Sequence, residues 1–155
     1  MNRSVYLSVL AGIFLIMGVP VKAGPDLERE QRLASEIVDS IIDGEPVMVE
    51  ADGTEFLGIY AETDADKPRG AILVLHGRGY HPNWMDVVYP VRTGMLEHGW
   101  NTLSVQLPVL DKEATYNDYL PLFDSSVGRI NAAIEFLKEQ GNDFIVLVAH
   151  SCGTH

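Results

Sequence analysis

The chain has 155 residues, 46% of them hydrophobic, and a formal net charge of −11. This length predicts one domain at most, and the excess of acidic groups excludes nucleic acid as a partner, because its phosphates would be repelled. Cys152 is the only cysteine and no Cys/His cluster has zinc-like spacing, so we expect no disulfide, no metal and no other cofactor. A hydrophobic core must hold the fold.

Residues 1–23 have the pattern of a secretory signal peptide. Arg3 supplies positive charge, an apolar run from Val5 to Val19 follows, and Val21 and Ala23 stand where a signal peptidase reads small residues. The apolar run is shorter than the roughly 20 residues that span a bilayer. We predict cleavage after Ala23 and export, to the periplasm or as a secreted protein, with no stable membrane anchor afterwards.

Residues 24–69 are predicted to form a helix, a hairpin and a loop. The expected elements are a helix over Leu27–Asp43 ended by Gly44, strands over Val47–Glu50 and Thr54–Ala61, and a polar loop over Thr63–Arg69. The hairpin prediction rests on Asp52-Gly53, a dipeptide typical of two-residue turns between strands.

Residues 70–155 alternate between apolar strands and helices. Three segments predict strands of a parallel sheet: Ala71–Leu75, Asn101–Leu107 and Phe144–Val148. The first and the third are continuous apolar runs, as expected of strands buried on both faces. A helix over Val87–His98 lies between the first two. A polar loop over Asp111–Asn117 and a helix ending near Gln140, with Val127, Ile130, Ala133, Ile134 and Leu137 on one side, precede the third. This order predicts an α/β fold with crossover helices.

The third strand is followed by Ala149-His150-Ser151-Cys152-Gly153. This is the pentapeptide of a nucleophile elbow with Ala in place of the first Gly, in which a strained strand-to-helix turn presents the serine. The residues two before and two after the serine approach each other closely, and this explains the small side chains. Ser151 is therefore the predicted nucleophile.

The first buried strand is followed by His76-Gly77-Arg78-Gly79. Acyl transfer through a serine needs two backbone N–H groups aimed at the developing oxyanion. Cys152 supplies one donor by its position after Ser151. Arg78 supplies the other, with Gly77 the alternative, because glycines let the backbone approach the substrate.

Residues 70–155 resemble the N-terminal half of the α/β-hydrolase superfamily and, more narrowly, an uncharacterised family of exported bacterial proteins with this fold. The residues that carry the narrower resemblance are His76-Gly77-Arg78-Gly79, His81-Pro82-Asn83-Trp84, Val91-Arg92, Gly99-Trp100, Thr102-Leu103, Gln106-Leu107-Pro108 and Arg129-Ile130. The resemblance implies an α/β-hydrolase sheet and an exported location. In this superfamily the acid and the histidine follow the nucleophile, and only four residues follow Ser151. We therefore expect a truncated chain that is inactive alone.

Other residues near these motifs have alternative interpretations. Among the five histidines, His76 is expected to hydrogen-bond within its loop, and His81 is the one that could reach a pocket. Tyr80 and Trp84 either line a substrate pocket or lie buried beneath the loop. The Arg78 side chain could contact an anionic substrate.

Three interpretations fit the sequence, the third being a complete small α/β domain of unrelated function. In the first, the full-length protein is a serine hydrolase that cleaves an ester, thioester or amide of a small-molecule or acyl substrate through an acyl-Ser151 intermediate. In the second, the same fold is a non-catalytic exported module that binds a ligand or a partner, since fold alone does not fix function.

Overall fold

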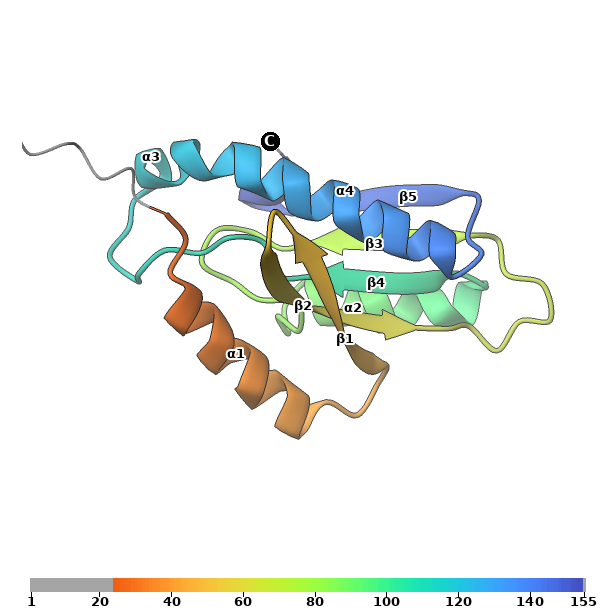
Figure 1. Ribbon diagram of the computed structural model, residues 1–155. Coiled ribbons are helices and arrows are strands. Elements are labelled where there is room, and N and C mark those ends of the chain that lie inside the picture. Colours follow the sequence, from red (N-terminus) through yellow and green to blue (C-terminus); the bar gives the residue numbers. More distant parts are fainter. Residues whose placement is uncertain (1–23, 155) are drawn as a thin grey trace, which may run out of the picture.

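The computed structural model describes residues 24–154 (Figure 1). The predicted signal peptide, residues 1–23, and His155 lie outside this range. One five-stranded sheet runs through the described residues in the order β1-β2-β4-β3-β5. Its strands are β1 (Glu45–Ala51), β2 (Thr54–Ala61), β3 (Ala71–Leu75), β4 (Asn101–Val105) and β5 (Ile145–Ala149). The predicted α/β class is confirmed.

Helices cover both faces of the sheet, α4 on one and α2 on the other (Figure 1). The helices are α1 (Leu27–Ser40), α2 (Val88–Gly94), α3 (Tyr116–Tyr119) and α4 (Phe123–Glu139), with short 3-10 turns η1 (Met95–His98), η2 (Leu120–Leu122) and η3 (Ser151–Thr154). None of the helices within residues 24–154 is long and apolar enough to cross a membrane.

The alternation of side chains along β3 explains the two layers. Leu73 and Leu75 pack in the cluster that includes Leu137 of α4, and Ile72 and Val74 pack in the cluster that includes Val88 of α2. Strand β3 is covered by a helix on each face, and this is why its sequence is a continuous apolar run.

The hairpin forms at the predicted dipeptide. Asp52 and Gly53 both have positive φ, +51° and +74°, as a two-residue turn of type I′ requires. The pairing then runs from Ala51 opposite Thr54 to Glu45 opposite Tyr60.

Strands β3, β4 and β5 are parallel, with Leu75 opposite both Val105 and Ala149. Their carboxyl ends therefore meet at one edge of the sheet. The loops that follow them, residues 76–79, 106–110 and 150–154, are brought together there. This edge carries the candidate site.

Several predicted boundaries differ by a few residues from the observed ones, and two of these differences have a clear cause. Helix α1 ends at Ser40 and not at Asp43, and the Ser40 hydroxyl donates to the Glu36 carbonyl (2.8 Å). Gly44 does not cap the helix; it lies in the bend before β1. Gly44 has a φ of +88°, and a Cβ there would lie 2.8 Å from the Tyr60 carbonyl oxygen. Strand β4 ends at Val105 and not at Leu107, because Leu107 N–H donates to His76 Nε2 instead of to a neighbouring strand.

Three further expectations are corrected. The segment predicted as the loop Asp111–Asn117 already contains the start of α3 at Tyr116, which a capping box of Thr115 and Asp118 initiates. Val127 is 52% exposed instead of facing the core. Strand β5 is half-exposed because β3 is its only partner among the described strands, and Leu147 is 49% exposed.

Candidate active site

Ser151 lies on a sharp turn directly after β5. Its φ of +54° is in the left-handed region that non-glycine residues seldom adopt. The turn is fixed on both sides, since His150 N–H donates to the Leu75 carbonyl (3.0 Å) and Gly153 N–H donates to the His150 carbonyl (3.0 Å). Ser151 is exposed, so its hydroxyl is accessible on a strained turn, the geometry that a nucleophile elbow needs.

Two glycines allow this turn to pack against the end of β3. A Cβ on Gly153 would lie 2.8 Å from the His76 carbonyl oxygen and 3.1 Å from that of Leu75. A Cβ on Gly77 would lie 3.1 Å from the Ser151 Cβ. The structure thus places Ser151 directly against the glycine loop that follows β3.

Ala149 occupies the position where the elbow motif has its first glycine. Its side chain is partly buried and packs against the apolar cluster between the sheet and α4. The added methyl group therefore has a place in the core, and the turn forms without a glycine there.

The predicted oxyanion residues lie together. Gly77, Arg78 and Cys152 line one small cleft, shared with Leu107 and Tyr119. The two backbone segments expected to donate to an oxyanion are thus neighbours. The Arg78 guanidinium forms a hydrogen bond of its own, because its Nη1 donates to the Ala114 carbonyl (2.6 Å). The oxyanion prediction concerns the backbone N–H of Arg78 and not this side chain.

His76 is fully buried and joins two of the loops. Leu107 N–H donates to its Nε2 (2.9 Å); Nε2 is therefore unprotonated, and Nδ1 carries the hydrogen and donates to the Gly77 carbonyl (2.7 Å). Burial lowers the His76 pKa to about 4. A neutral ring with both nitrogens bonded cannot take a proton from serine, so His76 shapes the loop instead of acting as a base.

Gln106 carried part of the family resemblance but was assigned no role from the sequence, although its side chain joins the loops at this edge. Its side-chain amide donates to the Leu107 carbonyl (2.7 Å) and lies 3.0 Å from His76 Nε2. Its backbone carbonyl accepts from Arg129 of α4 (3.0 Å). The available signal was a polar residue directly after the strand, and the sequence pattern could not say what it binds.

Within residues 24–154, no hydrogen bond joins the Ser151 hydroxyl to any histidine, and His150 Nδ1 is buried without a partner. His81 is half-buried, its Nδ1 accepts from Asn83 N–H (3.2 Å), and burial lowers its pKa. His98 is exposed at the end of η1. The His150 ring stacks on Tyr80 with centroids 6.3 Å apart.

Tyr80 and Trp84 stack face to face, with ring centroids 4.0 Å apart and planes 13° apart. Trp84 also packs against the apolar cluster under α2 that contains Ile72 and Val74. Both rings are only partly exposed. The arrangement favours burial beside the loop over a free pocket wall.

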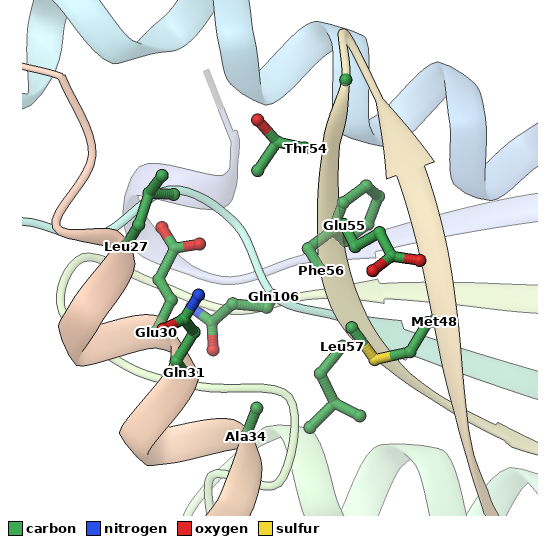
Figure 2. A pocket seen from close by; sticks show the side chains of 11 residues that line it. Leu27, Glu30, Gln31, Ala34, Met48, Thr54, Glu55, Phe56, Leu57 and Gln106 are labelled. Carbon is green, nitrogen blue, oxygen red and sulfur yellow. The ribbon is translucent and has the colours of Figure 1, made fainter.

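A separate cleft of about 310 Å³ lies between α1 and the β1–β2 hairpin. Figure 2 shows Glu30 and Gln31 of α1 and Gln106 facing it, with Phe56 and Leu57 of β2 on the other side. Its lining includes neither Ser151 nor the glycine loop, so it is not the predicted site. No cluster of metal-binding side chains occurs among residues 24–154.

Residues 17–121 match the model of a family described as "Protein of unknown function (DUF3530)". The chain belongs to this family. No curated protein matches the sequence of this DUF3530 chain.

Solved structures with the same fold are α/β hydrolases. The chain is similar to an esterase from Pyrococcus furiosus (19% identity, TM-score 0.54, covering 70% of this chain and 42% of that one). It is also similar to an alpha-beta serine hydrolase homologue from Coxiella burnetii (14%, 0.54, 73% and 54%) and to a monoglyceride lipase from Saccharomyces cerevisiae (15%, 0.52, 74% and 38%). The DUF3530 chain has a partial α/β-hydrolase fold and spans about two-fifths to a half of the length of these structures.

Proposed function

We propose that this chain carries the nucleophile and the oxyanion hole of an exported serine hydrolase. The observation that supports this most is the contact between Ser151, at a positive φ after a parallel strand, and Gly77, in the loop after the neighbouring strand. Attack of the Ser151 hydroxyl on a carbonyl would give an acyl-serine, and the N–H groups of Cys152 and of Arg78 or Gly77 would stabilise the oxyanion.

An ester is the first substrate class to test, with thioesters and amides next. Two neighbours in fold are named for their action as an esterase and a lipase, and ferulic acid is bound to another, Est1E from Butyrivibrio proteoclasticus. The α/β-hydrolase fold and the exposed turn at Ser151 support testing esters first.

In this proposal, residues outside the range 24–154 supply the base that activates Ser151. A serine hydroxyl needs a base to take its proton, and His76, His81, His98 and His150 do not offer one to Ser151. We therefore expect the described residues alone to show no turnover of simple esters.

A fluorophosphonate probe tests the proposal on the full-length gene product. We expect covalent labelling that mass spectrometry locates at Ser151 and that the Ser151→Ala variant abolishes. Absence of labelling, under conditions in which a control hydrolase reacts, would overturn the hydrolase and favour the non-catalytic binding module. Ser151-dependent ester turnover by residues 24–154 alone would overturn the dependence on other residues.

Export belongs to the same proposal and rests on the pattern of residues 1–23. N-terminal sequencing of the protein from the periplasm and the medium should find Gly24 as the first residue. A chain that stays in the cytoplasm with Met1 intact would contradict export.

A further inference from the structure

The first turn of α1 binds two loops at the candidate site. The Arg29 guanidinium donates to the carbonyl of Gly79 (3.1 Å), in the glycine loop after β3, and to the carbonyl of Leu110, after β4. One side chain thus ties together two loops that are far apart in sequence. Since a guanidinium is planar and always charged, both bonds are held in a fixed geometry.

Neighbouring residues of the same turn hold the second loop. Asp26 N–H donates to the Val109 carbonyl (2.7 Å), and the Glu30 carboxylate accepts from Val109 N–H (3.1 Å). The other oxygen of Glu30 pairs with Arg129 of α4 (2.9 Å). Glu30 and Arg129 are only 6% and 3% exposed, so this ion pair is shielded from solvent.

These contacts continue to Ser151. Arg129 donates to the Gln106 carbonyl (3.0 Å), and the next residue, Leu107, donates to His76 (2.9 Å). His76 donates to the Gly77 carbonyl, and Gly77 contacts Ser151. A buried chain of hydrogen bonds therefore runs from α1 through the loop after β4 to the loop predicted to bind the oxyanion.

We propose that α1 fixes the oxyanion loop for catalysis and that Arg29 is its principal positioning residue. The inference rests on the proposed hydrolase function. Arg29 contacts the loop backbone at Gly79 and does not reach the reacting atoms, so it acts through the placement of the Arg78 and Gly77 N–H groups. Oxyanion donors stabilise a transition state only when they are held within tenths of an ångström of the right position, and small displacements are costly.

Three variants test this in the full-length protein. Arg29→Met removes both hydrogen bonds and keeps the apolar stem. Arg29→Lys keeps the charge and one donating nitrogen, and Arg32→Met is the matched control. Arg32 lies one turn further along α1 and forms only an exposed ion pair with Glu28, which contributes little to stability. Two readouts are compared: hydrogen exchange of residues 77–80, and the rate at which a fluorophosphonate labels Ser151.

Arg29→Met should speed exchange in residues 77–80 while β3 and β4 keep their protection. It should lower the labelling rate by about 10- to 100-fold, with kcat reduced and KM for an ester nearly unchanged, and Arg29→Lys should recover part of the loss. Arg32→Met should behave as the unmodified protein. Equal labelling of Arg29→Met and Arg32→Met, or a uniform rise in exchange across the sheet, would overturn the proposal. If the unmodified protein is not labelled, the proposed hydrolase function fails. Separately, unchanged exchange of residues 77–80 in Arg29→Met would overturn the positioning role of Arg29.

Discussion

Gly77 and Ser151 are in such close contact that a Cβ on the glycine would lie 3.1 Å from the Cβ of the serine and 3.0 Å from His150 Nδ1. The two residues come from loops after neighbouring parallel strands, more than seventy positions apart. Their contact brings the predicted nucleophile beside the predicted oxyanion donors, and it makes the site sensitive to a single methyl group.

Gly77→Ala should therefore displace the turn or the loop. We expect the rate of Ser151 labelling by a fluorophosphonate in the full-length protein to fall about 10- to 100-fold. Gly94→Ala is the control, because a Cβ on Gly94 has nothing within 4 Å and the residue lies in α2 with helical backbone angles. A Gly77→Ala protein that labels as fast as the control would contradict the close contact.

Gly153→Ala should destabilise the fold itself. Its Cβ would lie 2.8 Å from the His76 carbonyl oxygen and 3.1 Å from that of Leu75, which are backbone atoms of the last residue of β3 and of the residue that follows it. We expect a loss of about 1–3 kcal/mol in the free energy of unfolding, measured by urea denaturation. Gly94→Ala should be neutral or slightly stabilising. An unchanged urea midpoint for Gly153→Ala would refute this expectation.

Burial of neutral His76 should make stability depend on pH. Its pKa in the folded protein is about 4, below the ordinary value of 6.5, so in this interval the unfolded chain binds a proton that the folded chain does not. The contribution is complete above pH 6.5 and is lost as the pH falls through about 4, by roughly 3 kcal/mol in total.

The test compares the unmodified chain with His76→Asn in urea denaturation at pH 7, 5 and 4. The stability advantage of the unmodified chain should shrink as the pH falls. Taking the difference removes the contribution of His81, whose pKa burial also lowers. A difference that stays constant over this range would show that His76 is not held neutral.

Removing only Arg129 from the buried ion pair with Glu30 should destabilise the protein more than neutralising both partners. Burial raises the pKa of the Glu30 carboxyl, and the Arg129 charge and the Val109 N–H oppose this. Arg129→Met leaves the carboxylate buried without its cation, and we expect a loss of about 3–5 kcal/mol. Adding Glu30→Gln should restore part of it, since the neutral amide still accepts from Val109 N–H. Urea denaturation of the two single variants and the double variant completes the cycle, and a double variant no more stable than Arg129→Met would contradict the coupling.

Local chemistry determined much of this protein from the sequence. Asp52-Gly53 fixed the hairpin because both residues tolerate positive φ, and the run at Ala71–Leu75 indicated a strand covered on both faces, which β3 is. The same reasoning placed Ser151 and Gly77 after the ends of two strands, where small residues allow the chain to turn tightly.

Tertiary structure determined the hydrogen bonds and the buried ion pair that the sequence pattern could not predict. Arg29, Glu30, Gln106 and Arg129 are ordinary polar residues in sequence, and their roles arise only when parallel strands bring their carboxyl ends to one edge and α1 lies beside it. Hydrogen bonds between residues so far apart in the sequence produce no periodic pattern, because each residue by itself is consistent with the helix, strand or loop in which it lies. Strand β5 shows the same limit: its residues are as apolar as those of β3, and only the sheet order makes one strand central and the other half-exposed.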